Sequence, residues 1–199
     1  MEYLPLVETF YSLQGEGAHA GRPAYFVRLA GCRNACPFCD TPQSWHPAGF
    51  PLAGVEEIVR QAAASGAVHC VVTGGEPTLH DLTSLCRELA KAGLQCWLET
   101  SGSEALSGEW DWICLSPKKG IAVHEEYYRL ASELKVVIGQ DSDFEFAERQ
   151  AAQVSPSCLC YLQPEWGVCK EVLPRLVAHV KSHPRWNLSL QLHKLIGVE

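Results

Sequence analysis

The sequence predicts an α/β fold, specifically a partial and open barrel of parallel strands with helices on its outside. Short apolar segments alternate with segments of helical periodicity, which is the pattern of a parallel sheet covered by helices. The 199 residues are too few for a closed eight-stranded TIM-type barrel, which typically needs about 250. No linker or low-complexity segment divides the chain, so we expect one domain over residues 1–199.

Two strands and two helices are predicted in the first half of the chain. Residues 24–30 form an apolar strand, and a helix follows over 55–63, where apolar residues recur at helical spacing. Residues 68–72 form the next strand. Thr78 is expected to cap the following helix, whose apolar stripe ends before Gly93.

The second half continues the alternation. The segment Ser142–Glu145 has the composition of a capping box, which would open a helix that ends near residue 154. Another helix is expected over 172–181. Apolar strands are expected at residues 95–99, 112–115, 134–138, 158–163 and 187–193.

Composition and charge argue against two classes of partner. The net charge of −7 and the lack of a basic run argue against a nucleic-acid-binding surface. No apolar stretch reaches membrane-spanning length, and the first residues are acidic where a signal peptide would be basic. Ten cysteines without a signal peptide or regular spacing favour free thiols over disulfides, so we expect a cytoplasmic protein.

Three of the ten cysteines stand close together as Cys32-x3-Cys36-x2-Cys39. Three thiolates on one loop can hold three corners of a cubane iron–sulfur cluster, whereas clusters that only carry electrons normally have four. The fourth iron would then be open to a small molecule. A zinc site completed by His46 is the alternative. The other seven cysteines are expected to pack as small hydrophobic residues.

Polar motifs follow several of the predicted strands. In Thr73-Gly-Gly-Glu-Pro77 two glycines let a ligand approach the backbone, although a tight strand-to-helix turn would also explain Pro77. The glycine-rich segment Ser12–Gly17 fits a hairpin as well as a functional loop. Because barrel strands end at one common rim, we expect three further segments to converge there: Glu99–Gly102, Ser116–Lys118 and Gln163–Trp166.

Two further patterns indicate a polar interior. Arg28 is a single charge in a mostly apolar strand, and it faces either the barrel interior, where it needs an anionic partner, or a solvated sheet edge. Along the last predicted strand, polar residues alternate with leucines and share one face: Asn187, Ser189, Gln191 and His193. A solvated edge strand would give the same alternation.

Taken together, these motifs resemble the 7-carboxy-7-deazaguanine synthases, a family of small radical S-adenosylmethionine (SAM) enzymes of the queuosine pathway. The resemblance runs from Ser12–Gly17 to the C-terminal Leu-Gln-Leu-His-Lys segment, and so through nearly the whole chain. It implies a reduced radical SAM core fold and a radical SAM lyase. The reaction it implies is a Mg²⁺-dependent ring contraction of 6-carboxy-5,6,7,8-tetrahydropterin to 7-carboxy-7-deazaguanine, with release of ammonia.

The same resemblance implies roles for particular residues. Cys32, Cys36 and Cys39 would bind a [4Fe-4S] cluster, and the Thr41 hydroxyl would bind Mg²⁺, which prefers oxygen ligands. No catalytic side chain is assigned beyond the cluster and SAM. The residues expected to contact SAM are Phe38, Cys39, Asp40, Gly75, Glu76, Ser116, Pro117, Lys118, Gln163, Pro164, Glu165 and Trp166. Those expected to contact the pterin are Leu13, Gln14, Gly15, Glu16, Arg28, Thr73, His193 and Glu199.

Two other functions fit part of the sequence. An activating enzyme for a glycyl-radical protein also carries a CxxxCxxC loop, but Arg28 and the polar row in residues 187–193 favour a small anionic substrate. A zinc-binding interaction module that uses His46 is the non-enzymatic alternative. The family resemblance further implies a homodimer, and a flavodoxin or ferredoxin as the electron donor.

Overall fold

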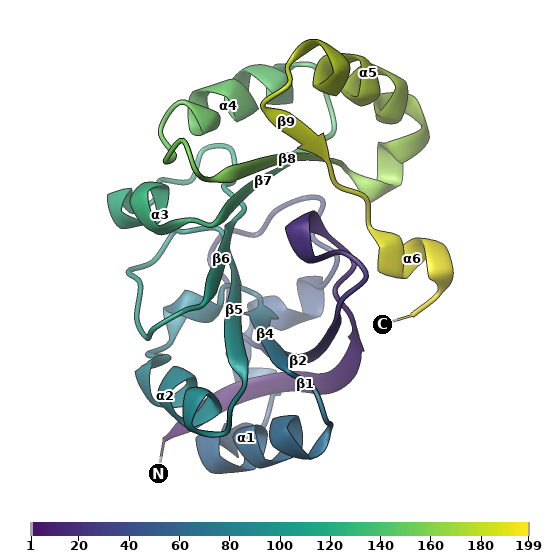
Figure 1. Cartoon of the computed structure of the whole chain (residues 1–199). Helices are drawn as coiled ribbons and strands as arrows, with labels where there is room; N and C mark the ends of the chain where they lie inside the picture. Colours follow the sequence, from purple (N-terminus) through teal and green to yellow (C-terminus); the bar gives the residue numbers. More distant parts are fainter. Residues whose placement is uncertain (1, 199) are drawn as a thin grey trace.

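One curved sheet organises the residues that the computed structural model describes, 2–198 (Figure 1). Its order is β3-β1-β2-β4-β5-β6-β7-β8-β9, with β3 and β9 at two separate edges, so the barrel is open. β2 and the strands β4 to β9 run parallel to one another. β1 is antiparallel to both of its neighbours, β2 and β3. The strands are β1 Tyr3–Leu13, β2 Pro23–Leu29, β3 Leu52–Gly54, β4 His69–Gly74, β5 Gln95–Thr100, β6 Trp112–Leu115, β7 Glu133–Ile138, β8 Leu159–Pro164 and β9 Trp186–Leu188.

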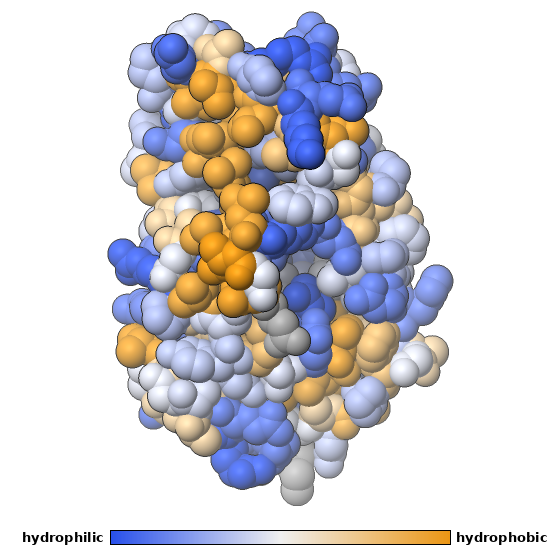
Figure 2. Space-filling view, turned by 90° about the vertical axis from the view of Figure 1, so that its right-hand side faces the viewer, coloured by the Kyte–Doolittle hydropathy of each residue, from blue (hydrophilic) through white to orange (hydrophobic). Residues whose placement is uncertain are grey.

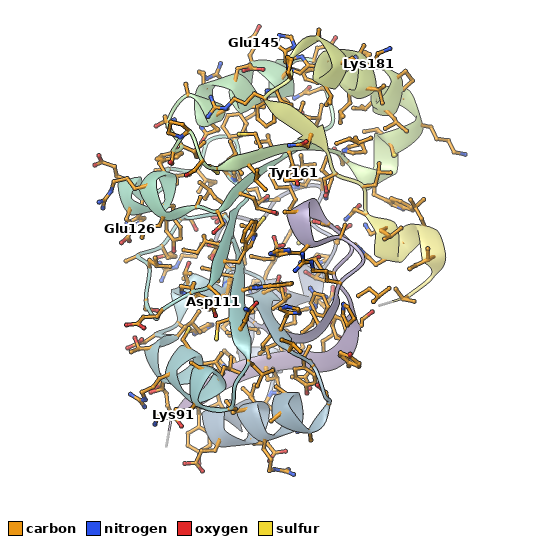
Figure 3. All side chains as sticks on the ribbon, in the orientation of Figure 1. Lys91, Asp111, Glu126, Glu145, Tyr161 and Lys181 are labelled. Carbon is orange, nitrogen blue, oxygen red and sulfur yellow. The ribbon has the colours of Figure 1, made fainter. Side chains whose placement is uncertain are left out.

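Helices cover the convex side of this sheet, and only the short α6 lies on the concave side, next to the tip of the β1–β2 hairpin (Figure 1). Charged side chains on the outer layer, such as Lys91 and Lys181, point into solvent, whereas Tyr161 of β8 points toward the concave side (Figure 3). The helices are α1 Val55–Ala64, α2 Thr83–Lys91, α3 Glu125–Leu130, α4 Ser142–Ala151, α5 Cys169–Ser182 and α6 Leu192–Ile196, with 3-10 turns η1 Gly17–His19, η2 Pro42–Trp45, η3 Pro47–Gly49, η4 Pro77–Leu79 and η5 Trp166–Val168.

The alternation of side chains along β7 shows how the sheet separates its two faces. Leu134, Val136 and Ile138 are at most 1% exposed and belong to the apolar core beneath the helices. Glu133 and Lys135 lie between them in sequence and therefore point to the concave face. Both are also buried, so the concave face holds charged groups away from water.

Most of the predicted strands and outer helices are confirmed, with ends that differ by a few residues. The hairpin interpretation of the segment Ser12–Gly17 is also confirmed, because β1 pairs with β2 around it. The first strand was expected at residues 24–30, and β1, which precedes it, was not predicted. Among the described residues no helix is long and apolar enough to cross a membrane.

Three local predictions are wrong. The last strand ends at Leu188 and the chain turns into α6, because the backbone N–H of Leu192 bonds to the Gly15 carbonyl rather than to β8. Thr78 does not cap α2, since its N–H and hydroxyl both donate to Glu76. Ser142 is the first helical residue of α4 rather than its cap, and its hydroxyl accepts a hydrogen bond from Lys119.

Candidate active site

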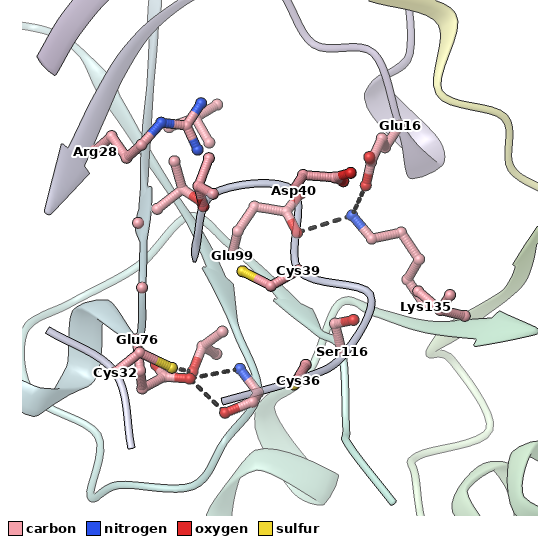
Figure 4. Close-up of a pocket in the computed structure, with 18 of the residues that line it drawn as sticks. Glu16, Arg28, Cys32, Cys36, Cys39, Asp40, Glu76, Glu99, Ser116 and Lys135 are labelled. Carbon is pink, nitrogen blue, oxygen red and sulfur yellow. Dashed lines mark hydrogen bonds and ion pairs between the residues drawn. The ribbon is translucent and has the colours of Figure 1, made fainter. Parts of the chain in front are cut away.

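A cavity of about 290 Å³ opens on the concave face, at the C-terminal ends of the strands (Figure 4). It is lined by the cysteine loop, the turn after β4, the ends of β5 to β8, the loop after β1 and the start of α6. Figure 2 faces the α6 side of the molecule and shows a polar hollow next to exposed apolar side chains. Leu195 and Ile196 of α6 are exposed apolar residues. The predicted convergence of motifs at one rim is therefore observed.

The loop after β2 brings all three motif cysteines to this cavity. Its backbone is held by η2, because Gly31 and Cys32 donate to the carbonyls of Ser44 and Trp45 at 2.7 and 3.1 Å. The indole Nε1 of Trp45 donates to Cys39 Sγ at 3.3 Å. Burial raises the pKa of Cys32 and Cys36, and Lys118 partly opposes the rise at Cys36. Cationic iron would stabilise the thiolates that burial alone disfavours.

The three thiols fit a cluster better than a zinc ion. Tetrahedral zinc with Zn–S bonds of about 2.3 Å holds its sulfur ligands about 4 Å apart. The cysteine sulfurs are not among the groups of described ligand atoms that lie within 4.8 Å of one another. His46, the fourth ligand of the zinc alternative, is outside the set of residues that line the cavity. At least one pair of the three cysteine sulfurs therefore lies farther apart than a tetrahedral zinc ion would hold it.

The Gly-Gly-Glu turn after β4 lies directly against the cysteine loop. A Cβ at Gly75 would stand 2.3 Å from the Gly31 carbonyl oxygen and 2.8 Å from Cys32 Cβ, so a larger residue could not fit. The backbone N–H of Gly75 bonds to Leu29, and that of Glu76 bonds to Gly31. Glycine is thus required here for a close approach between two loops. Gly75 also lines the cavity, so its expected contact with a ligand stays a prediction.

The Glu76 carboxylate is fully engaged inside the protein. It is 2% exposed and accepts hydrogen bonds from the hydroxyls of Thr78 and Thr100, at 2.7 and 2.6 Å. Ser101 donates to it through both its backbone N–H and its hydroxyl. Glu76 therefore ties the end of β4 to the end of β5. The predicted contact of Glu76 with SAM stays a prediction, and its side chain is committed to this structural role.

The residues assigned to SAM divide into two groups. Most of them line the cavity, and there Lys118 Nζ donates to Ser116 Oγ at 2.7 Å and lies 5.9 Å from the Phe38 ring centroid. Burial lowers the pKa of Lys118. Gln163 Oε1 accepts from the Ser189 hydroxyl at 2.8 Å. Four members of the set are not among the cavity-lining residues: Pro117, Pro164, Glu165 and Trp166.

The residues assigned to the pterin lie together on the cavity wall, except Glu199, which is outside the described residues. Arg28 faces this cavity, and its Nε donates to Glu8 Oε1 of β1 at 2.7 Å (Figure 4). The edge-strand alternative for Arg28 is wrong, because β2 lies between β1 and β4. His193 also reaches the cavity, although from α6 rather than from a strand, and it packs directly on Gly15.

A buried charge network that no sequence motif indicated forms one side of the cavity. Lys135 Nζ lies 2.6 Å from Glu16 and 2.9 Å from Glu99. Burial alone would raise the pKa of Glu16, but the attraction of Lys135 outweighs it and lowers that pKa to about 2. Burial likewise opposes the charge on Lys135, yet the surrounding acidic groups hold its pKa well above the usual value. The sequence did offer one signal for this network: Lys135 is a charged residue within a mostly apolar strand, as Arg28 is.

Comparisons of the sequence and of the fold with known proteins point to the same family. Residues 27–121 match the model of the radical SAM superfamily. The chain is 47% identical over 194 residues to the 7-carboxy-7-deazaguanine synthase of Synechocystis sp., a match that covers 98% of this chain and 93% of that protein. It is 45% identical to the protein of the same name from Flavobacterium psychrophilum, over 99% of this chain and 93% of the other. Its fold is similar to the crystal structure of QueE from Escherichia coli, with a TM-score of 0.84 at 30% identity, over 96% of this chain and 95% of that one.

Proposed function

The chain belongs to the 7-carboxy-7-deazaguanine synthase family of the radical SAM superfamily, and from this premise we propose which of its residues bind the cofactors and the substrate. It is a radical SAM lyase of the queuosine pathway that forms 7-carboxy-7-deazaguanine by ring contraction. Its cofactors are a [4Fe-4S] cluster and SAM. The substrate in this proposal is 6-carboxy-5,6,7,8-tetrahydropterin.

One observation carries the assignment of residues: the three motif cysteines and the described residues assigned to the pterin line the same cavity. Cys32, Cys36 and Cys39 would hold the cluster, with SAM between it and the residues Phe38, Gly75, Ser116, Lys118 and Gln163. When bound, the cluster and SAM supply the one-electron chemistry that starts the ring contraction. The protein's own contribution is to hold the substrate beside them and to keep water away.

Arg28 is the proposed anchor of the substrate carboxylate. Glu8 takes the Nε–H of the guanidinium and thereby orients it, and the remaining nitrogens point into the cavity (Figure 4). A guanidinium can bind a carboxylate through two parallel hydrogen bonds, which fixes orientation as well as position. Gln14, Thr73 and His193 surround the same space and would position the ring system.

Thr41 is the proposed ligand of Mg²⁺. It lines the cavity directly after the cysteine loop, and one hydroxyl plus substrate oxygens and water would suit the hard cation. The neighbouring Asp40 carboxylate is already bound by Lys194 at 2.6 Å and Gln191 at 2.9 Å. The proposal therefore assigns the metal to Thr41 rather than to Asp40.

Several wider assignments are also proposals. One continuous sheet, whose first strand begins at Tyr3 and whose last ends at Leu188, supports a single domain over residues 1–199. Exposed apolar residues of α6, such as Leu195 and Ile196, are compatible with a homodimer. A flavodoxin or ferredoxin would supply the electron, and the reducing cytoplasm is the expected location because thiols and cluster persist there.

The test is an anaerobic assay of cluster-reconstituted protein with SAM, a reductant, Mg²⁺ and 6-carboxytetrahydropterin, read by mass spectrometry. We expect 7-carboxy-7-deazaguanine to form without matching consumption of SAM, because SAM is regenerated in the proposed reaction. SAM cleavage to 5′-deoxyadenosine without any deazaguanine would retain the superfamily and reject the substrate. A colourless protein that binds zinc and no iron or sulfide would reject the cofactor assignment as well.

A further inference from the structure

Lys135 on β7 joins two carboxylates that come from distant parts of the chain. Its Nζ contacts Glu16 of the loop after β1 and Glu99 of β5, and its side chain is 4% exposed (Figure 4). A buried ion pair contributes little net stability compared with apolar residues of the same volume. The position of such a pair in a cavity wall, rather than in the core beneath the helices, therefore indicates a role beyond folding.

Each carboxylate on Lys135 also binds an amide through its other oxygen. Gln14 Nε2 donates to Glu99 Oε1 at 3.2 Å, and Gln191 Nε2 donates to Glu16 Oε1 at 2.9 Å. The five side chains form a continuous polar chain with Lys135 at its centre, and Gln14, Glu16, Glu99 and Lys135 line the cavity. Gln14 and Glu16 belong to the proposed pterin contacts, so the geometry of the chain determines where those contacts lie.

The other groups facing Lys135 do not replace its charge. Glu133 and Cys114 lie close to Glu99, and burial raises the pKa of both, which favours their neutral forms. Lys118 also lines the cavity, but it is only partly buried and bonds to Ser116, outside this network. Without the ammonium group of Lys135, Glu16 and Glu99 would repel each other within a poorly solvated space.

We propose that Lys135 is a positioning residue that holds the loop carrying Gln14 and Glu16 against β5, in the geometry in which the pterin binds. This inference rests on the proposed function. It separates two properties of the enzyme. The motif cysteines lie outside the polar chain, which meets the residues assigned to SAM at its far end, where Gln191 donates to Asp40. Loss of the Lys135 charge should therefore weaken pterin binding and leave the cluster and SAM cleavage intact.

The experiment compares four proteins: the wild type, Lys135→Met, Lys135→Arg and Lys91→Met. Methionine keeps most of the volume of lysine without its charge, and arginine keeps a charge that can bridge two carboxylates. Lys91 is an exposed residue of α2 that pairs with Glu88 and serves as the matched control. On cluster-loaded protein, the dissociation constant of 6-carboxytetrahydropterin, its KM and kcat, and SAM cleavage without pterin are measured.

For Lys135→Met we expect a dissociation constant and a KM that rise at least 30-fold, with pterin-independent SAM cleavage within twofold of the wild type. Lys135→Arg should recover part of the binding, and Lys91→Met should match the wild type throughout. Pterin binding by folded Lys135→Met within threefold of the wild type would overturn the proposal. If Lys135→Met does not fold, the same comparison is made with Lys135→Gln.

Amide hydrogen exchange tests the positioning role of Lys135 independently of the proposed function, because the measurement needs no substrate. In Lys135→Met we expect faster exchange in peptides that cover residues 12–20, and unchanged exchange in those that cover α1. Unchanged exchange over residues 12–20 would reject the positioning role even in an active enzyme. A wild type that neither binds nor converts the pterin would reject the proposed function, while the exchange result would still test the role of Lys135 in holding the loop.

Discussion

The two faces of the sheet are built by different rules, although the same strands supply both. The convex face of β7 presents Leu134, Val136 and Ile138 to helices that follow or precede it in the chain. The concave face of the same strand presents Glu133 and Lys135 to partners more than thirty residues away, such as Glu99. Apolar burial is non-directional and tolerant of changes in partner, whereas buried charges need specific partners at specific distances.

This difference predicts that substitutions on the two faces fail in different ways. Changes on the convex face should lower the free energy of unfolding and leave the chemistry of the folded fraction unchanged. Changes on the concave face and in its loops should impair chemistry in a protein that still folds. The predictions that follow test that separation.

The largest effect is expected at the cysteine loop. Cys36→Ala removes one of three proposed cluster ligands, so we expect SAM cleavage to fall by at least 1,000-fold while circular dichroism of the protein stays native. The measurement is 5′-deoxyadenosine formed per protein under anaerobic reduction, together with iron and sulfide content. Cys169→Ala, at a cysteine outside the cavity lining, is the matched control and should retain activity. Full retention of cleavage by Cys36→Ala would remove the cluster assignment.

On the convex face, Leu134→Ala should give the opposite pattern. Leu134 is fully buried in the core beneath the helices, and truncating such a leucine costs about 2–5 kcal/mol of unfolding free energy. We expect a lower urea midpoint and an unchanged KM for the pterin, measured at a temperature where the variant remains folded. A Leu134→Ala protein of wild-type stability with a raised KM would break the proposed division between the faces.

The same division explains how much of the molecule could be predicted from the sequence. The convex face follows local periodicity, so strands such as β4 and β7 and helices such as α1 were found. The end of the chain was assigned to a strand because residues 187–193 alternate, but α6 forms instead. There Gln191 bonds to both Glu16 and Asp40, and Lys194 bonds to Asp40. Such long-range polar contacts have no local signature.

The site was predicted unevenly for the same reason. Motif spacing, together with the other motifs, singled out Cys32, Cys36 and Cys39, and the structure brings all three to the cavity because they lie on one loop. Lys135 was missed because its two partners come from the loop after β1 and from β5. The SAM contact predicted for Glu76 stays a prediction, and the hydrogen bonds to its carboxylate from η4 and the end of β5 had no sequence signal. A motif can thus indicate that a residue is important without indicating which group that residue contacts.

A smaller effect is expected for the metal at Thr41. Thr41→Ser keeps the hydroxyl and Thr41→Ala removes it, so the alanine variant should require at least tenfold more Mg²⁺ for half-maximal product formation. The serine variant should lie within threefold of the wild type. Cluster content and SAM cleavage without pterin are the controls, since neither should change. Equal Mg²⁺ requirements in the two variants would argue against Thr41 as a ligand.

The smallest effect is expected at the aromatic end of the concave face, where His19 lies between Trp97 and Trp112, with ring centroids 4.0 and 4.3 Å away. Its Nδ1 is buried without a hydrogen-bond partner among the described residues. Burial, followed by the nearby charges of Arg22 and His69, lowers the pKa of His19 from its usual 6.5 to about 4. The folded protein thus holds His19 neutral at a pH where the unfolded chain would protonate it.

The sign of the pH dependence follows from this pKa. The stability that His19 contributes is present above pH 6.5 and is lost as the pH falls from 6.5 toward 4. Because solvent screens the partly exposed ring, the loss should stay below about 1.4 kcal/mol per pH unit. His19→Phe keeps the ring stack and removes the titration, so its urea midpoint should fall less than that of the wild type between pH 7.5 and 5.5.

Replacement of the exposed His124 by phenylalanine is the control for this pH series and should leave the wild-type slope. If His19→Phe and the wild type lose stability equally over the same range, the aromatic end of the concave face does not hold a neutral histidine. The concave face would then be less isolated from water than its charge network implies, and the contrast between the two faces of the sheet would rest on the buried charges of β7, Glu133 and Lys135.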